Sequence, residues 1–349
     1  MARRKRKEKI KEFILNNVES HPKEINRLAA SRFDISRTAV SNHLRDLANE
    51  GLLIATGKTK GRRYQLLNIV DERLELNVAE NQQEDVVWRE RILPLMDGIK
   101  KNVRDICQYG FTEIYNNVID HSASDSSMIK IKRNAAQVSL EVIDTGVGIW
   151  NKLQSELNLL DPRHALLELS KGKVTTDEER HTGEGIFFTS RMFDKFSIDS
   201  GTLLYSKERI RDDWLIEVEE SPPLEGTAVS MEIRTATDIT RTEVFDKFAS
   251  EHHDYGFTRT HVPLKLLKYE GEELVSRSQA RRLLARLEGF LEVFLDFDGI
   301  TTIGQAFADE IFRVYRNEHP NIAIIAVRIT PRVREIIDRA LKAHRENMI

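Results

Sequence analysis

Cysteine and long apolar runs are both scarce in this 349-residue chain, and each scarcity excludes a class of protein. The single cysteine, Cys107, rules out an internal disulfide framework and Cys-based zinc sites, and its place in an apolar stripe predicts a small buried side chain. No apolar run reaches the roughly 18 residues of a membrane span. Charged residues interrupt the apolar stretch after the basic start at residues 3–7, unlike a signal peptide. We therefore expect a cytoplasmic protein in a reducing compartment, with no membrane partner.

Positive charge is concentrated at the N-terminus. Residues 1–70 hold 16 Lys and Arg against 7 Asp and Glu, a net charge of +9. Because the whole chain carries −3, the remaining residues carry −12. Such asymmetry predicts a basic nucleic-acid-binding module attached to an acidic part. With 40% apolar residues, the chain has room for two or three domains with separate cores.

The basic segment shows helical periodicity followed by a hairpin pattern. Apolar residues recur within 10–14, 25–29 and 40–47, and Ser36 is suited to the N-cap of the third helix. The polar side of that helix carries Arg37, Thr38, Ser41, Asn42 and Arg45. Two short strands then enclose a basic tip with Lys58, Lys60, Arg62 and Arg63.

These features resemble a winged helix-turn-helix over about residues 5–68. The resemblance implies that the polar face of the third helix reads base edges in the major groove, while the wing cations neutralise phosphates. DNA is therefore the expected partner of this segment. A module for protein interaction or dimerisation is the alternative.

The next informative segment is helical, at residues 110–122. Its spacing places Glu113 and Asn117 one turn apart. Mg²⁺ prefers oxygen ligands and shares its shell with phosphates and water, so the Asn117 amide suits it. The Glu113 carboxylate, one turn earlier, is placed to orient or deprotonate a nucleophile beside the metal.

Three further blocks involve glycine. An apolar strand over 138–143 ends at Asp144, whose carboxylate can accept a hydrogen bond from an exocyclic amine, and the glycines after it permit a tight turn. A glycine-rich turn over 181–185 opens a helix whose N-terminus favours phosphate. The last block, 225–233, places a Gly-Thr pair at the head of an alternating strand.

In this order the four blocks, over roughly residues 100–235, resemble the GHKL ATPase superfamily, which includes gyrase, histidine kinases and the anti-sigma-factor serine kinases. The resemblance implies ATP and Mg²⁺ as cofactors, with Glu113 as general base, Asn117 as metal ligand and Asp144 as the adenine-binding carboxylate. It further implies cofactor contacts at Asp120, Gly146, Gly148, Ile149, Lys173, Thr182, Gly183, Gly185, Ile186 and Thr227.

The insert at residues 150–180 would then form a lid over the phosphates. Lys171, Lys173 and Arg180 are its candidates for contacting the β- and γ-phosphates. A solvated loop is the alternative interpretation of the same cations.

The C-terminal part alternates strands and helices, which predicts a small α/β domain. Strands are expected at 262–268, 292–297 and 322–327, and helices at 276–287, 304–316 and from Pro331. Residues 293–307 resemble STAS-like modules related to anti-sigma-factor antagonists. In that alignment the phosphate-accepting position falls on Gln305, which has no hydroxyl. The module is therefore expected to dock or regulate, with a protein partner, and not to be phosphorylated.

The expected fold class is a multidomain α/β protein. It comprises a winged helix over 1–70, a linker over 71–84 that begins with a short strand, a GHKL α/β sandwich over 85–240, with a mixed sheet and helices on one face, and a STAS-like α/β domain over 255–349.

We expect Mg-ATP occupancy to control conformation or assembly, a homodimer included, and thereby regulation of the transcription type. A serine/threonine kinase resembling the anti-sigma-factor kinases and a slow ATPase clamp are the alternatives. Histidine-kinase chemistry ranks last, since neither His21 nor His43 begins an acceptor motif.

Overall fold

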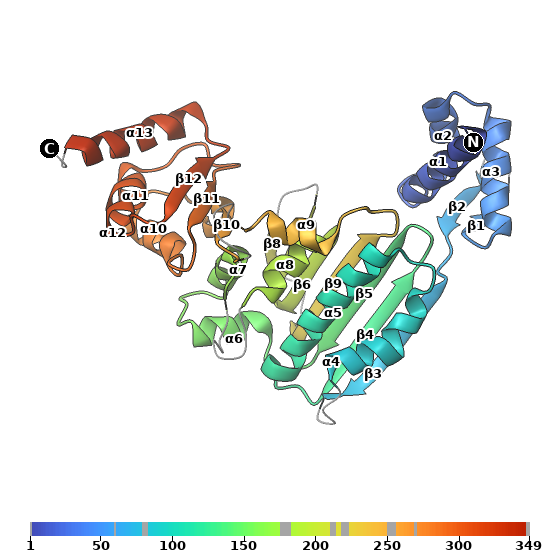
Figure 1. Ribbon diagram of the computed structural model, residues 1–349, viewed down its shortest axis with the longest axis horizontal. Coiled ribbons are helices and arrows are strands. Elements are labelled where there is room, and N and C mark those ends of the chain that lie inside the picture. The colour runs from blue at the N-terminus through green and yellow to red at the C-terminus, as the bar shows by residue number, and fades with distance from the viewer. Residues whose placement is uncertain are drawn as a thin grey trace.

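The computed structural model describes residues 2–58, 61–78, 83–174, 183–209, 214–217, 223–249, 256–268 and 271–346. In these ranges the strands form three separate sheets, of two, seven and three strands. Figure 1 shows the sheets as successive parts of the chain, each accompanied by helices. The chain is therefore a multidomain α/β protein, as the sequence predicts. No helix in these ranges has the length and apolar character needed to cross a membrane.

The N-terminal unit joins three helices to a two-stranded antiparallel sheet. The Ser36 side chain accepts a hydrogen bond from the Ala39 N–H at 3.1 Å, which confirms the expected N-cap of the third helix. The apolar stripe of that helix, Val40, Leu44 and Leu47, is completely buried. The elements are α1 (Ala2–Asn17), α2 (Ile25–Phe33), α3 (Arg37–Asn49), β1 (Leu53–Thr56) and β2 (Arg63–Leu66).

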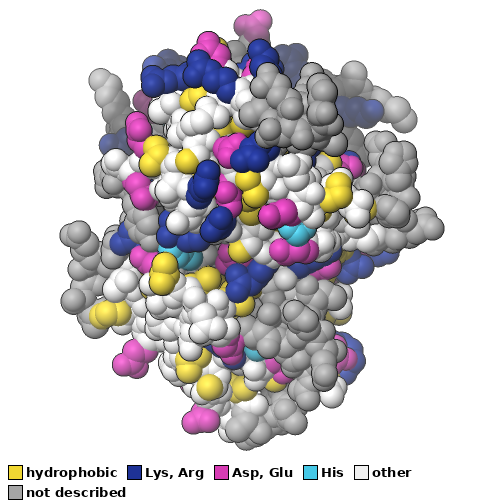
Figure 2. Space-filling view, turned by 90° about the vertical axis from the view of Figure 1, so that its left-hand side faces the viewer, with side chains coloured by type: hydrophobic (Ala, Val, Ile, Leu, Met, Phe, Trp, Pro, Cys, Tyr) yellow, Lys and Arg dark blue, Asp and Glu magenta, His cyan; other side chains and the backbone are white. Residues whose placement is uncertain are grey.

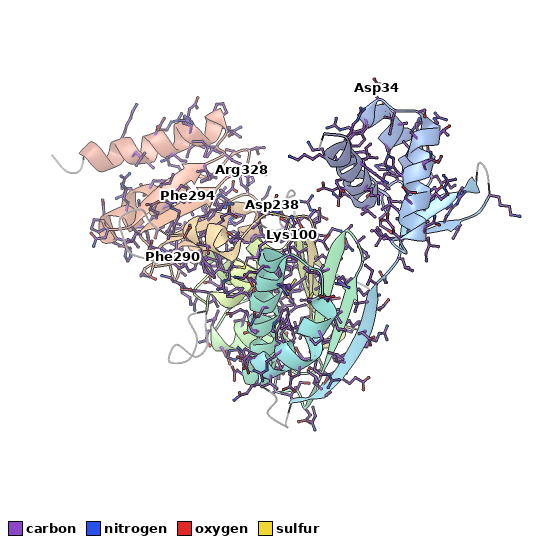
Figure 3. The ribbon with its side chains drawn as sticks, turned by 45° about the vertical axis from the view of Figure 1, so that its right-hand side comes forward. Asp34, Lys100, Asp238, Phe290, Phe294 and Arg328 are labelled. Carbon is purple, nitrogen blue, oxygen red and sulfur yellow. The ribbon has the colours of Figure 1, made fainter. Side chains whose placement is uncertain are left out.

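A seven-stranded sheet forms the central unit, with strand order β3-β4-β5-β9-β6-β7-β8. Figure 1 shows α5 and the short α4 lying across one face of this sheet. Cys107 is completely buried on α5 beside Phe111, which confirms its expected role as a small apolar side chain. Lys100, just before α5, pairs with Asp238 at 2.9 Å, and Figure 3 labels both residues.

The strands of this unit are β3 (Val70–Asn77), β4 (Ser126–Arg133), β5 (Gln137–Asp144), β6 (Lys195–Gly201), β7 (Leu203–Glu208), β8 (Trp214–Glu217) and β9 (Leu224–Arg234). The helices outside the β5–β6 connection are α4 (Glu84–Val87), the π-helical η3 (Trp88–Ile92), the 3-10 helix η4 (Leu93–Met96), α5 (Lys101–His121) and α9 (Arg241–Asp246).

The prediction of a mixed sheet is wrong. Every pair of neighbouring strands described in the central sheet runs antiparallel. β5 and β6 do run parallel to each other, because each is antiparallel to β9, which lies between them. The helical connection from β5 to β6 thus joins two parallel strands, but a later strand is inserted between them. Such an insertion pairs distant segments and leaves no local sequence pattern.

The edge strand β3 confirms the short strand expected at the start of residues 71–84, but it places residues 71–77 in the central sheet and not in a linker. The strand pairs with β4 from Val70 opposite Arg133 to Asn77 opposite Ser126. Leu76 of this strand is buried in the hydrophobic core. Alternating apolar residues supply one buried face even though the segment is acidic overall.

In the described part of the connection from β5 to β6, the chain forms three helices. They are α6 (Ile149–Glu156), α7 (Arg163–Lys171) and α8 (Gly185–Met192). α8 packs against α5, whereas α7 packs against both α6 and the first strand of the C-terminal unit. The predicted lid residue Arg180 lies in the stretch 175–182, outside the described residues.

The C-terminal unit has three parallel strands in the order β10-β11-β12. The expected alternation of strands and helices is confirmed, although the first strand ends at Pro263 and continues as a 3-10 helix. On the side of the molecule that Figure 2 shows, acidic and basic side chains are interspersed, with isolated hydrophobic side chains between them. The elements are β10 (Arg259–Pro263), η5 (Leu264–Leu267), α10 (Arg277–Leu284), β11 (Glu292–Asp296), α11 (Gln305–Asp309), the π-helical η6 (Glu310–Tyr315), α12 (Arg316–Glu318), β12 (Ala323–Val327) and α13 (Pro331–Glu346).

Candidate functional site

A cavity of about 320 Å³ lies where α5, the end of β5, α6, α8 and β9 meet. Its volume is in the range of pockets that hold small molecules. All four sequence blocks contribute to its lining. The predicted site residues that line it are Glu113, Asn117, Asp144, Gly148, Ile149, Gly183, Gly185, Ile186 and Thr227.

Glu113 and Asn117 reach the cavity from successive turns of α5. Both are partly buried. Glu113 is hydrogen-bonded to the Tyr109 side chain one turn earlier, and burial together with the Glu113 charge raises the Tyr109 pKa above its usual range. A Cβ added to Gly185, the first residue of α8, would lie 2.1 Å from Glu113 Oε2. A side chain at position 185 would therefore require the Glu113 carboxylate to move.

Asp144 supplies a buried carboxyl group at the end of β5, with 5% of its surface exposed. Its Oδ1 accepts a hydrogen bond from the Gly146 N–H at 2.9 Å, and the Thr227 N–H also supports the carboxyl group. Burial raises the Asp144 pKa, and these two hydrogen bonds oppose the rise. The carboxyl orientation is thus fixed by backbone donors before any ligand arrives.

The turn after Asp144 requires glycine at two positions for different reasons. A Cβ on Gly146 would lie 1.9 Å from the Ser122 carbonyl oxygen, so a side chain there would collide with the backbone at the end of α5. Gly148 has φ of +78°, in the left-handed region that glycine tolerates. Together they bring the turn against α5 and lead directly into α6.

Thr227 ties β9 to the start of α6. Its Oγ1 accepts a hydrogen bond from the Ile149 N–H at 3.1 Å, and the residue is buried. The hydroxyl therefore satisfies one of the free N–H groups at the N-terminus of α6. Thr227, which the resemblance names as a cofactor contact, thus both lines the cavity and holds the adjoining turn.

Several predicted residues lie elsewhere. Asp120 is exposed and does not line the cavity, and Gly146 belongs to the turn beside the cavity without lining it.

The two predicted lysines contact the C-terminal unit. Lys173 donates from Nζ to the Gly289 carbonyl of that unit at 2.7 Å. Lys171 is completely buried and also contacts that unit. Thr182 lies outside the described residues.

Five polar residues that line the cavity were not predicted from the sequence: Asn116, His121, Ser122, Lys152 and Glu184. Lys152 donates from Nζ to the His121 carbonyl at 2.9 Å, which places a cation beside the carboxyl end of α5. Burial raises the Glu184 pKa, and nearby Lys173 opposes the rise. One feature of the sequence could have predicted Lys152 as a site residue: it lies in the first turn of a helix that begins directly after the glycine turn.

The residues predicted to contact DNA belong to the N-terminal unit and are exposed where the structure describes them. Arg37, Thr38, Ser41, Asn42 and Arg45 are all exposed on α3. Asn26 on α2 donates to Ser41 Oγ at 2.8 Å, and Arg45 donates to Asn42 Oδ1 at 2.7 Å, so these contacts steady the exposed face. In the β1–β2 loop, the exposed cations are Lys58, Arg62 and Arg63, while Lys60 lies outside the described residues.

Comparison with known families bears on the C-terminal unit. Residues 279–333 match the family described as STAS-like domain of unknown function (DUF4325). The match begins within α10 and ends within α13, so it covers β11, β12 and the helices between them. The chain therefore contains a STAS-like domain, as the sequence predicts. No curated protein matches the chain.

Proposed function

We propose that the chain is an ATP-binding and DNA-binding regulatory protein, in which Mg-ATP occupies a GHKL-type site and controls the conformation or assembly of the molecule. The observation that carries the proposal is the convergence of four distant sequence blocks on one cavity. The blocks supply a base, an amide ligand, a buried carboxyl group and a glycine-opened helix. This combination is what a purine triphosphate with Mg²⁺ requires.

In the proposed complex, Asp144 accepts a hydrogen bond from the exocyclic amine of adenine. The two backbone N–H groups already bound to its carboxyl group require an oxygen acceptor facing them, so the carboxylate offers a further acceptor to the ligand. Asn117 would hold Mg²⁺ through its amide oxygen. Bound Mg²⁺ would neutralise phosphate charge. The start of α8 and Lys152 would face the phosphates as donors and as a cation.

The N-terminal unit is proposed to be a winged helix that binds DNA. The support is the exposed polar face of α3 and the exposed cations of the β1–β2 loop. Ligand occupancy affects DNA binding only if the two conformations of the chain bind ATP differently. Operator affinity that is identical with and without saturating Mg-ATP would contradict the regulatory part of the proposal.

The decisive experiment is calorimetric titration of Mg-ATP into the unaltered chain and into Asp144→Asn. In the variant, Gly146 and Thr227 keep the amide oxygen, so the amide nitrogen faces the adenine amine as a second donor. Loss of a hydrogen bond to a charged group costs about 1.5–3 kcal/mol, or roughly a 10- to 150-fold weaker affinity.

The matched control is Asp199→Asn. Asp199 lies on β6 of the same sheet, and burial raises its pKa too, but it does not line the cavity. The control should bind Mg-ATP as the unaltered chain does. Equal affinities for all three chains would remove Asp144 from the proposed site.

A second candidate function is a protein serine/threonine kinase acting on a partner. The observation that favours it is Glu113, a carboxylate in the cavity lining next to the first residue of α8. A base in that position could activate either water or a partner hydroxyl. Incubation with labelled ATP and STAS-domain partners distinguishes the two functions, because only a kinase transfers label to a protein.

A further inference from the structure

One short segment of the chain faces both the cavity and the STAS-like domain. Leu169 and Val174 line the cavity. Between them, Lys171 and Lys173 bind the C-terminal unit. A change in the position of this segment therefore affects the cavity and the interface at the same time.

Lys171 is buried in the interface with none of its surface exposed. Its Nζ donates three hydrogen bonds: to Glu168 Oε1 at 2.8 Å, to the Ala285 carbonyl at 2.8 Å and to the Arg282 carbonyl at 3.2 Å. Two of the acceptors are carbonyls at the C-terminal end of α10, where the helix dipole favours a cation. All three ammonium protons are satisfied, so the buried charge depends on the docked domain.

Lys173 makes the second contact. Its Nζ lies 2.7 Å from the Gly289 carbonyl and 4.8 Å from the centre of the Phe290 ring. Figure 3 labels Phe290 where the C-terminal unit meets the central unit. Gly172, with φ of +80°, permits the turn between the lysines, and a Cβ there would lie 2.6 Å from the Phe257 ring. Lys173 is thereby held away from the cavity lining, although it interacts electrostatically with Glu184, which belongs to that lining.

An arginine from the C-terminal unit completes the interface. Arg286 donates from one guanidinium nitrogen to the Leu157 carbonyl at 3.2 Å, and its other terminal nitrogen lies 3.6 Å from Glu168 Oε2. Its side chain is 42% exposed and does not line the cavity, so its replacement weakens the interface without changing the cavity lining.

We propose that docking of the STAS-like domain and occupancy of the cavity oppose each other through Lys173. This inference rests on the proposed function. In the docked form, the Lys173 ammonium donates a hydrogen bond to the Gly289 carbonyl. When a polyphosphate enters the cavity, the ammonium moves toward the negative charge of the phosphates, and the interface with the STAS-like domain loosens. The STAS-like domain is thus an intramolecular inhibitor of nucleotide binding. By linkage, nucleotide weakens the docking to the same extent.

The test compares Mg-ATP affinity, by calorimetric titration, for the unaltered chain, Arg286→Met and the control Arg277→Met. Arg277 lies on α10, and its ion pairs with Asp309 and Glu310 stay within the C-terminal unit. Arg286→Met should bind Mg-ATP about fivefold more tightly or better, because the loosened interface competes less for Lys173. Arg277→Met should bind as the unaltered chain does.

Hydrogen exchange supplies the reciprocal measurement on the unaltered full chain. Mg-ATP should speed amide exchange in residues 282–290 and leave exchange in β12 unchanged. Equal or weaker Mg-ATP binding by Arg286→Met, or exchange at 282–290 that Mg-ATP does not speed, overturns the inference while the nucleotide site stands. If none of the chains binds Mg-ATP, the proposed function fails and this inference fails with it.

Discussion

The turn beside the cavity offers a stability test whose magnitude follows from the structure. In Gly146→Ala, the new Cβ would lie 1.9 Å from the Ser122 carbonyl oxygen, and real Cβ atoms do not approach closer than 3.0 Å. The turn and the end of α5 must therefore separate by about 1.1 Å, the difference between these distances. The same carbonyl accepts the Val147 N–H at 2.9 Å, and that hydrogen bond cannot survive such a displacement.

The cost has three parts. Overpacking of a tight contact costs about 1–3 kcal/mol, and loss of the Val147 hydrogen bond costs about 0.5–1.5 kcal/mol. Alanine lowers the entropy of the unfolded chain, which offsets about 0.4–1 kcal/mol. The free energy of unfolding should therefore fall by a central value of about 2 kcal/mol. For a unit of this size, the Tm should fall by roughly 4–8 °C.

Tryptophan fluorescence during heating is the assay, because the three tryptophans, at positions 88, 150 and 214, all belong to the central unit. Gly61→Ala is the control: no atom lies within 4 Å of its added Cβ, and its φ is outside the positive range. The control should melt as the unaltered chain does. A Gly146→Ala chain with an unchanged Tm would refute the view that this close approach shapes the cavity.

Three further predictions address the site and the proposed DNA-binding face. Because burial raises the Asp144 pKa above its ordinary value of 3.8, Mg-ATP affinity should fall as pH decreases through that raised pKa, and titrations of Asp144→Asn should lack this component. The contribution of Asp144 to the free energy of unfolding depends on pH in the opposite direction. It is fully present below the pKa that Asp144 has in the unfolded chain, and it is lost as pH rises through the raised pKa of the folded chain. Glu113→Gln should lower any ATP turnover about 10²- to 10⁴-fold with Mg-ATP affinity retained, and unaffected turnover would remove Glu113 from the mechanism. Replacing Arg62 and Arg63 by Ala should reduce the slope of log affinity for DNA against log salt by about 2, and an unchanged slope would exclude phosphate contacts at the loop.

Local patterns predicted many of the elements and part of the cavity lining. Ser36 caps α3 because its hydroxyl accepts from the Ala39 N–H, a contact set by adjacent residues. Asp144 and the glycines after it were recognisable because a strand end, a carboxylate and a tight turn are contiguous in the sequence. The meeting of these residues with Glu113 and Asn117 came from the resemblance, since spacing alone does not bring separate segments together.

Contacts between distant segments determine the features that could not be predicted from the sequence. Nothing near Lys171 in the sequence shows that its charge is buried, because its carbonyl acceptors come from α10, more than 100 positions away. The position of β9 between β5 and β6 is likewise decided by pairing of distant strands. Lys152 lines the cavity because the glycine turn leads into α6 beside the end of α5, where the Lys152 ammonium meets the His121 carbonyl.

The distribution of the hydrophobic core limits how the STAS-like domain can respond to a ligand. Buried residues of the N-terminal unit form a cluster of their own, from Ile10 to Tyr64. A second cluster runs without a break from Leu76, in the central sheet, to Ala340, in α13. Since the central and C-terminal units share this core, separating them completely would expose a large apolar area at a cost proportional to that area. The response to nucleotide should therefore be a small shift at the polar contacts of Lys173 and its neighbours, as in sliding of packed helices.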